Sequence, residues 1–166
     1  MNDDDFVARL KLLFRYDPFT GKLFWLVNKR GHHLIGREAG SLKRNGYISI
    51  SIDGKRHQAH RIIWAMAHGK MPQQCIDHIN GDKADNRLEN LRSATVAENT
   101  RNAGKPATNS SGYKGVYFEK GRGKWRAKIS VMNRDIHIGY FGSCEDAVAA
   151  YQEKSVLLHG AFARLA

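Results

Sequence analysis

The stretch from residue 74 to residue 102 constrains this chain more than any other, because polar residues are concentrated there between two short apolar runs. Residues 75–79 are long enough for one strand, and residues 91–94 for its antiparallel return. Residues 80–90 between them are rich in Asn and Asp, which favour turns. Thr95 and Glu98 have the spacing of a capping box, which predicts a helix beginning after Thr95.

The same stretch carries residue types that suit phosphodiester hydrolysis. Asp77 and His78 are neighbours on the first strand, so their side chains point to opposite sides and can share a site only if they flank it or the strand is distorted. Asp77 and Asn99 offer hard oxygen ligands that suit Mg²⁺. An imidazole, with a pKa of about 6.5, is a competent general base at neutral pH. A hard ion beside such a base supports attack of water on a phosphodiester.

The run DHINGDKADNRLENLR, followed by EN, resembles the HNH endonuclease motif in the variant where Asn replaces the final His. The resemblance implies a ββα-metal nuclease core at about residues 74–102, with Asp77 as a metal ligand and His78 as the general base. It implies that Asn90 bonds backbone, holds the loop and orients the histidine, and that Asn99 is the second metal ligand. The stretch 60–72 also resembles the lead-in of phage homing-type members.

Other readings of these residues stay open. A structural zinc site would use His57, His60, Cys75 and His78, but it would consume the histidine that a nuclease needs. A calcium EF-hand is excluded, since its register of acidic residues is absent. The remaining polar residues of the loop are interpreted as loop formers rather than metal ligands: Asn80, Asp82, Asp85 and Asn86.

A small β-rich region is predicted to precede the nuclease core. The pattern indicates a helix over residues 6–14, a turn over 16–22, a strand over 23–27, and a hairpin of 46–52 with 55–59 around Asp53-Gly54. A helix over residues 60–68 would end at Gly69. Arg61 and Arg92 are candidates for contacts with DNA phosphates, and for Arg61 a structural role is the alternative.

The last third of the chain predicts a separate module. Residues 103–111 have the composition of a linker between a domain at 1–102 and another at 112–166. Three β runs, at 115–119, 125–131 and 136–141, precede a helix opened by Ser143 and closed by Gly160. Alternation places Arg126 and Lys128 on one face of the middle strand and its apolar residues on the other. The chain as a whole is therefore predicted to be α+β.

The run SGYKGVYFEKGRGKWRAKI, then IGYFGSCEDAVAAY, resembles the ethylene-response-factor (APETALA-type) DNA-binding domain. The resemblance implies a three-stranded antiparallel sheet packed on one helix, which binds DNA through the sheet. The DNA-facing candidates are Lys114, Tyr117, Lys120, Arg122, Arg126, Lys128 and His137. Tyr117 and Phe118 stand where arginines are usual, so no sequence preference is carried over, and a solvated charged face is the alternative.

Composition agrees with a nucleic-acid partner. There are 27 Lys and Arg residues against 16 Asp and Glu, a net charge of +11, which favours a polyanion. No apolar run approaches the ~18 residues of a membrane span, and no basic amphipathic helix is visible. The two cysteines form no disulfide framework, which indicates a reducing cytoplasm, that of a bacterial host if the chain is phage-encoded.

These features predict a site-preferring DNA endonuclease of homing type that uses one divalent ion, Mg²⁺ or Mn²⁺, and no other small-molecule cofactor. Its partner would be double-stranded DNA, and it would act as a monomer or weak dimer that nicks the duplex or cuts both strands. The alternatives are a non-catalytic DNA-binding regulator with a relict nuclease fold, and an enzyme directed at RNA.

Overall fold

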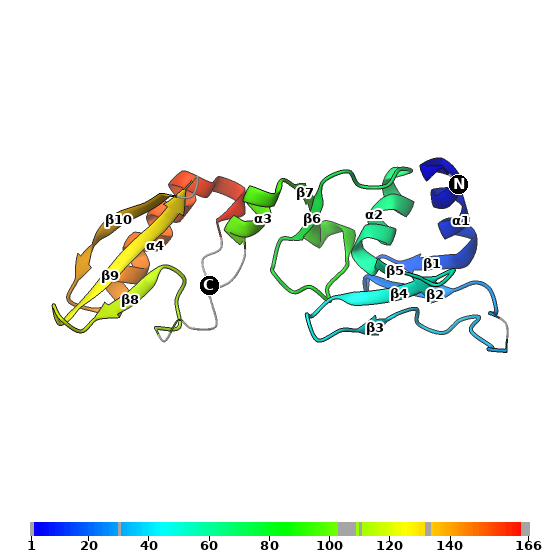
Figure 1. The fold of residues 1–166 in the computed structure, drawn as a ribbon, viewed down its shortest axis with the longest axis horizontal. Helices are drawn as coiled ribbons and strands as arrows, with labels where there is room; N and C mark the ends of the chain where they lie inside the picture. The colour runs from blue at the N-terminus through cyan, green and yellow to red at the C-terminus, as the bar shows by residue number, and fades with distance from the viewer. Residues whose placement is uncertain (1, 30, 103–108, 110, 132–133, 164–166) are drawn as a thin grey trace. The chain divides into compact units, whose positions relative to one another are not determined.

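The computed structural model describes the whole chain except residues 1, 30, 103–108, 110, 132–133 and 164–166 (Figure 1). The chain forms two compact units, Met1–Thr95 and Val96–Ala166. Each combines helices with small antiparallel strand pairings or sheets, so the predicted α+β class is confirmed. Among the described helices, none is long and apolar enough to cross a membrane.

The first unit alternates short strands with two α-helices. In chain order the described elements are α1 (Asp3–Leu13), β1 (Phe14–Asp17), β2 (Lys22–Trp25), β3 (Ser41–Leu42), β4 (Ile48–Ile52), β5 (Lys55–Gln58), α2 (Ala59–His68), β6 (Cys75–His78), a 3-10 turn (Leu88–Asn90) and β7 (Leu91–Ala94). Strands β1 and β2 pair with each other, β3, β4 and β5 form one sheet in that order, and β6 pairs with β7.

The N-terminal helix passes directly into the β1–β2 hairpin. Asn2 caps α1 by accepting a hydrogen bond from the backbone N–H of Asp5 at 2.8 Å. The sequence predicts a helix through Phe14 and a turn from Tyr16, but the helix ends at Leu13 and Phe14 begins a strand. The reason is tertiary, because Phe14 pairs with Trp25 across the hairpin and is only 1% exposed.

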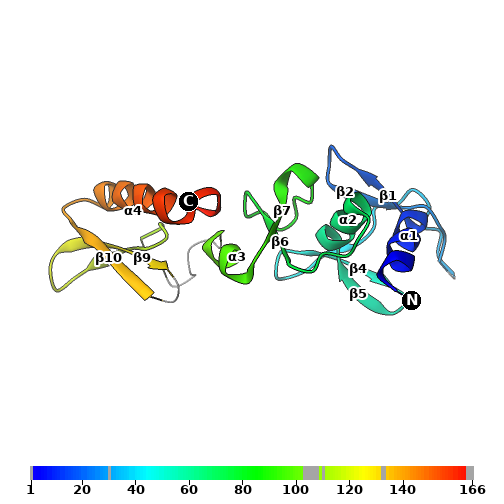
Figure 2. The same ribbon diagram turned by 90° about the horizontal axis from the view of Figure 1, so that it is seen from above.

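The predicted β4–β5 hairpin and α2 are confirmed. Asp53 and Gly54 both have positive φ, at 50° and 77°, which is the conformation that a tight two-residue hairpin turn requires. Helix α2 ends at Gly69, which adopts the left-handed conformation. Helices α1 and α2 pack on each other, and α2 also packs on β4 and β5 (Figures 1 and 2). Their apolar faces meet in one core that also receives side chains from β2, β6 and β7.

The second unit consists of α3 (Val96–Asn102), β8 (Val116–Glu119), β9 (Lys124–Val131), β10 (Arg134–Phe141), α4 (Cys144–His159) and a 3-10 turn (Gly160–Phe162). The sheet is antiparallel in the order β10-β9-β8, and α4 packs on one of its faces. Val116, Ala127 and Ile129 of the sheet pack against Ala147 and Tyr151 of α4. The predicted arrangement of three strands on one helix is confirmed.

The structure does not test two predicted features, the linker at residues 103–111 and the domain limit at residue 102. The proposed linker at 103–111 lies outside the described residues except for Asn109 and Ser111, and Asn109 is buried and donates to the carbonyl of Tyr113 at 2.6 Å. Helix α3, which we assign to the nuclease core, is grouped with the second unit by its contacts. The domain limit at residue 102 is therefore an expectation from sequence.

Candidate active site

The β6–β7 hairpin holds Asp77 and His78 side by side on one strand. Asp77 lies opposite Arg92, and His78 opposite Leu91, in a regular antiparallel register. Both side chains are buried, at 4% and 3% exposure. They reach different neighbours, so the strand is flanked by two polar environments instead of being distorted.

Asp77 forms an ion pair with Arg92 of the partner strand. The Nε and Nη2 atoms of Arg92 lie 2.9 and 2.8 Å from Oδ2 of Asp77. A buried carboxylate needs such a partner, because an uncompensated charge away from water is costly. Arg92, which we predicted to face DNA, is thus committed in this structure to the proposed metal ligand.

The imidazole of His78 is oriented by a buried amide. Its Nε2 lies 3.0 Å from Oδ1 of Asn86, which is itself 2% exposed. The Nδ2 group of Asn86 donates to the carbonyl of Ala84 at 3.2 Å, so the oxygen of the amide is the atom that faces the ring. An amide oxygen can only accept, so Nε2 of His78 is the donor in this bond, and in the neutral ring the lone pair is then on Nδ1.

Two further rings lie against His78. The ring centroid of His60 is 4.9 Å away in an edge-on arrangement, and that of Tyr47 is 5.9 Å away. His60 is 3% exposed, and its Nδ1 has no hydrogen-bond partner among the described residues. Burial, with smaller contributions from His78 and Arg61, lowers the pKa of His60 to about 3. His60 is therefore neutral, and it adds no charge beside His78 at neutral pH.

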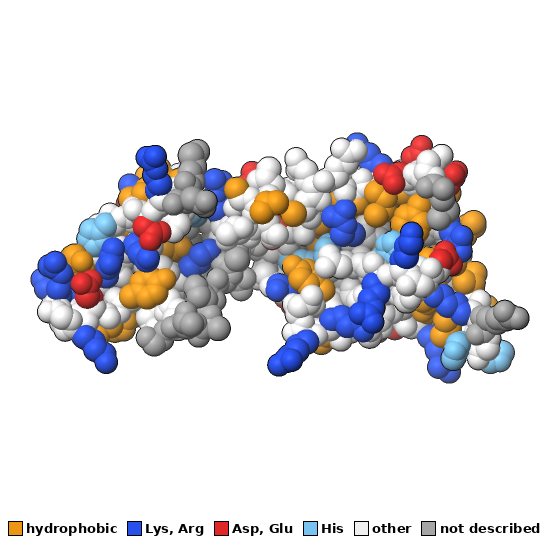
Figure 3. Space-filling model, in the orientation of Figure 1, with side chains coloured by type: hydrophobic (Ala, Val, Ile, Leu, Met, Phe, Trp, Pro, Cys, Tyr) orange, Lys and Arg blue, Asp and Glu red, His pale blue; other side chains and the backbone are white. Residues whose placement is uncertain are grey.

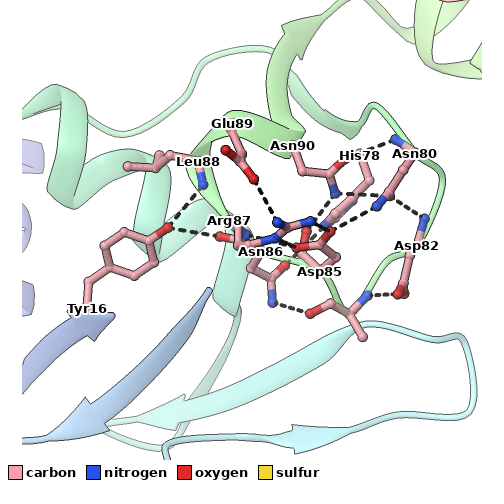
Figure 4. A network of polar contacts seen from close by, with 11 residues as sticks. Tyr16, His78, Asn80, Asp82, Asp85, Asn86, Arg87, Leu88, Glu89 and Asn90 are labelled. Atoms are coloured by element: carbon pink, nitrogen blue, oxygen red, sulfur yellow. Dashed lines mark hydrogen bonds and ion pairs between the residues drawn. The ribbon is translucent and has the colours of Figure 1, made fainter. Parts of the chain in front are cut away.

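The loop between the two strands, residues 79–90, is held by its own side chains (Figure 4). Asn90 accepts from the backbone N–H of Asn80 at 2.9 Å and donates to the side chain of Asn80 at 3.0 Å and the carbonyl of Asp85 at 2.8 Å. Asp82 closes a smaller turn by accepting from the N–H of Ala84. These bonds show that Asn90 contacts both ends of the loop, and the predicted role of Asn90 in orienting the histidine stays a prediction.

The guanidinium group of Arg87 also stabilises the loop, by bonding two acidic side chains. Arg87 donates from Nε and Nη2 to the two oxygens of Asp85, at 2.9 and 2.7 Å, and from Nη1 to Glu89 at 2.7 Å. Hydrogen bonds from Arg87 are the largest influence on Asp85 and lower its pKa to about 2. Asp85 is therefore ionised at neutral pH and serves the loop, as the sequence analysis expected.

The zinc alternative finds no support in the arrangement of its ligands. Across the part of the chain that the structure describes, no three His, Cys, Asp or Glu side chains gather closely enough to hold a metal ion. His57, His60, Cys75 and His78 therefore do not make the four-ligand cage that structural zinc requires.

Two further residues predicted from the sequence, Asn99 and Arg61, lie on the helices α3 and α2. Asn99 lies on α3 and is half-buried, so its role as second metal ligand remains an expectation from the motif. Arg61 donates to the carbonyls of Gln74 and Pro72 at 3.1 and 2.7 Å, tying α2 to the segment before β6. This is the structural alternative for Arg61, and its contact with DNA stays a prediction.

In the second unit, helix α4 lies on one face of the sheet (Figures 1 and 2), and the opposite face carries charged and aromatic side chains (Figure 3). We call this surface the open face; its residues are Tyr117, Arg126, Lys128, Ser130, Asp135, His137 and Tyr140. The central residue is Arg126, opposite Tyr117 on one side and Tyr140 on the other. Its Nε is buried without a hydrogen-bond partner within the described residues.

The other residues predicted to contact DNA differ in their positions relative to the open face and in their partners. Lys128 pairs with Asp135 at 2.7 Å. Lys120 and Arg122 are exposed in the β8–β9 turn, and the guanidinium of Arg122 lies 4.8 Å from the ring centre of Tyr140. Lys114 instead donates to the carbonyl of Arg101 at 2.6 Å, at the C-terminal end of α3, which is a helix-capping contact.

Comparison with known proteins shows the family to which the chain belongs. A profile of the HNH endonuclease family matches residues 57–101. Protein 3.8 of Escherichia phage T7 is 33% identical over 111 residues, which cover 66% of this chain and 91% of that protein. The chain belongs to the family of T7 protein 3.8 and contains an HNH endonuclease domain.

A second relative carries the HNH name. The uncharacterized HNH endonuclease L247 of Acanthamoeba polyphaga mimivirus is 38% identical over 68 residues, which cover 36% of this chain and 17% of that protein. No solved structure matches the chain significantly. The HNH match includes Asp77, His78, Asn90 and Asn99, and it ends before the second unit's sheet.

One residue of this site was not predicted from the sequence. Asn86 was expected to be a loop former only, whereas its amide is the hydrogen-bond partner of the His78 ring. The available signal was weak, because nothing in the spacing distinguishes Asn86 from the other Asx residues around it.

Proposed function

We propose that this protein is a site-preferring, divalent-metal-dependent DNA endonuclease that hydrolyses phosphodiester bonds. The observation that carries the proposal is the state of His78, whose ring is fixed by Asn86 with its lone pair on Nδ1, one residue from the buried carboxylate of Asp77. Both residues lie inside the HNH match. A base of fixed tautomer next to a hard oxygen ligand is the combination that hydrolysis requires.

The donor set fits a magnesium-type ion. Asp77 would supply a carboxylate and Asn99 would supply a carboxamide oxygen, both of them hard ligands. Mg²⁺ is commonly held by one or two carboxylates together with water and substrate phosphates, so a sparse protein contribution suits it. When bound, the ion would neutralise the charge that develops on the leaving oxygen.

The chain's own residues perform the proton transfer. His78 takes a proton from the attacking water at Nδ1 while Asn86 keeps the proton on Nε2 in place. The water oxygen forms a bond to phosphorus and the bond from phosphorus to the 3′-oxygen breaks. The released 3′-oxygen takes a proton from solvent water, and His78 returns its extra proton to solvent, so the products carry a 5′-phosphate and a 3′-hydroxyl. Asn90 holds the 79–90 loop and, through it, the strand that bears His78.

We assign DNA recognition to the second unit, as an ethylene-response-factor-like module. The open face presents Arg126 between two tyrosines, a combination able to contact phosphates and base edges in a groove. A tethered binding module raises the local concentration of the nuclease at its site. The relation to a phage T7 protein supports action in the cytoplasm of a bacterial host. We further propose, from the sequence motifs alone, a homing-type enzyme that acts as a monomer or weak dimer.

The test is relaxation of supercoiled plasmid by the purified chain. We expect nicked or linear DNA with Mg²⁺ or Mn²⁺ and intact plasmid after addition of a chelator. Competition by duplex RNA at fixed salt should be weaker than competition by duplex DNA. Tight binding to duplex DNA with no cleavage under any divalent metal would contradict the proposal and would favour a non-catalytic regulator.

A further inference from the structure

The N-terminal hairpin contacts the 79–90 loop at a position about 70 residues away in the chain. The hydroxyl of Tyr16, on β1, accepts from the backbone N–H of Leu88 at 3.0 Å and donates to the carbonyl of Asn86 at 3.4 Å (Figure 4). The tyrosine thereby uses both its acceptor and its donor on the backbone of one short segment.

A second contact of the hairpin reaches the same segment. Gly21 adopts φ +69° in the β1–β2 turn, and a Cβ there would lie 2.5 Å from the backbone nitrogen of Arg87 and 2.7 Å from the carbonyl carbon of Asn86. Backbone meets backbone at this point, so no side chain can move aside. Tyr16 and Gly21 together fix residues 86–88 from one side.

The same segment fixes the imidazole from the other side. The backbone of Asn86 bonds Tyr16, its Nδ2 bonds the carbonyl of Ala84, and its Oδ1 accepts from Nε2 of His78. With 2% exposure, Asn86 has no water to replace these partners. Any displacement of its backbone would move the acceptor on which the His78 ring depends.

We propose that the β1–β2 hairpin is a positioning element for His78, acting through Asn86: Tyr16 and Gly21 hold the backbone of Asn86, and Asn86 sets the orientation and tautomer of the imidazole. In calling His78 the general base, this inference rests on the proposed function. Tyr16 and Asn86 are positioning residues, since no step of the reaction uses them directly. Reacting groups must be held within about 0.5 Å of their productive geometry, which is a reason for such a brace.

The experiment uses the full chain with ¹⁵N-labelled histidine. In the unaltered protein we expect the His78 ring to show a protonated Nε2 and an unprotonated Nδ1. Asn86→Asp keeps an acceptor oxygen and should keep that signature, whereas Asn86→Leu should lose it. At saturating DNA, Asn86→Leu should cleave about 100-fold more slowly and Tyr16→Phe about 10-fold more slowly, with DNA affinity changed less than twofold.

Asn28→Leu is the matched control. The Asn28 side chain accepts from two backbone N–H groups, those of Leu34 and Ile35, and none of its described hydrogen bonds reaches the 79–90 loop. Its loss should lower stability while leaving the His78 signature and the cleavage rate at saturation unchanged. Equal effects of Asn28→Leu and Asn86→Leu would show that both act through stability alone, and would overturn the proposal.

Each remaining outcome is decisive. Asn86→Leu with an unchanged signature and unchanged rate would overturn the proposal. If Asn86→Leu does not fold, Tyr16→Phe decides: a normal signature and normal rate there would overturn it. If no form of the protein cleaves DNA but the His78 signature follows the residue at position 86 as expected, the positioning stands and the nuclease assignment fails.

Discussion

The 79–90 loop of the first unit and the open face of the second use polar residues in opposite ways. In the loop, Asn86 and Asn90 are buried and every described bond ties them to backbone or to another side chain of the site. On the open face, Lys128 and Asp135 pair near solvent. This difference corresponds to the two tasks that we propose for these regions, proton transfer in the first unit and DNA contact in the second. A proton transfer needs one fixed geometry, whereas contact with phosphates tolerates side chains that adjust on binding.

After loss of His78 itself, the largest expected effect comes from removing the buried carboxylate. Asp77→Asn keeps the shape of the side chain but removes the charge that would hold the divalent ion, so we expect cleavage to fall about 1000-fold, consistent with a loss of several kcal/mol. DNA affinity should change only a few-fold. Single-turnover cleavage at several Mn²⁺ concentrations measures this.

Asp82→Asn is the control for that variant, because Asp82 lies in the 79–90 loop that follows the strand of Asp77, and its carboxylate accepts only from the backbone N–H of Ala84 in the described contacts. It should retain cleavage within a few-fold. Unchanged cleavage in Asp77→Asn, or an equal loss in Asp82→Asn, would contradict the assignment of Asp77.

A smaller effect should appear in the acid stability of the first unit. His60 has a pKa of about 3 in the folded chain against 6.5 unperturbed. Between these values the unfolded chain binds a proton that the folded chain does not, so the free energy of unfolding falls as pH is lowered from 6.5 toward about 3. The slope should approach about 1.4 kcal/mol per pH unit, a tenfold change in the unfolding equilibrium.

His60→Phe should flatten that slope, and urea unfolding between about pH 7 and pH 4, followed by amide signals of the first unit, measures it. His68→Phe, near the exposed end of the same helix, is the comparison variant and should leave the slope as it is. An identical slope in the unaltered protein and in His60→Phe would refute this origin of acid sensitivity.

The smallest effects are expected on the open face. Arg126→Ala and Lys128→Ala should each weaken DNA binding several-fold and lower the salt dependence of the affinity by about one counterion, while cleavage at saturating DNA stays unchanged. Lys154→Ala on α4, which covers the other face of the sheet, should have no effect. If none of the three substitutions changes the affinity for DNA, the open face is only a solvated charged surface.

Local patterns were sufficient to predict most of the fold. The turn at Asp53-Gly54, the glycine that ends α2 and the strand that bears Asp77 each follow from a few adjacent residues, and the structure confirms them. The four-residue strand β1 was missed, because its strand character depends on pairing with β2 and on burial of Phe14.

The sequence predicts the residues of the site's motif, but it does not predict the contacts that hold those residues in place. The positions of Asp77 and His78 on β6 follow from the apolar run that carries them. The contact of Tyr16 with the loop joins residues 70 positions apart, and no local spacing can indicate it. The engagement of Arg92 by Asp77 likewise depends on the register of two strands, which sequence alone leaves undetermined.

The most direct test of the account compares cleavage and binding by His78→Ala in the same samples of duplex DNA with Mg²⁺. If His78 is the general base, cleavage at saturating DNA falls by about three orders of magnitude or more, and the dissociation constant for DNA stays within a few-fold of the unaltered protein. Cleavage by His78→Ala at close to the normal rate would contradict the central claim.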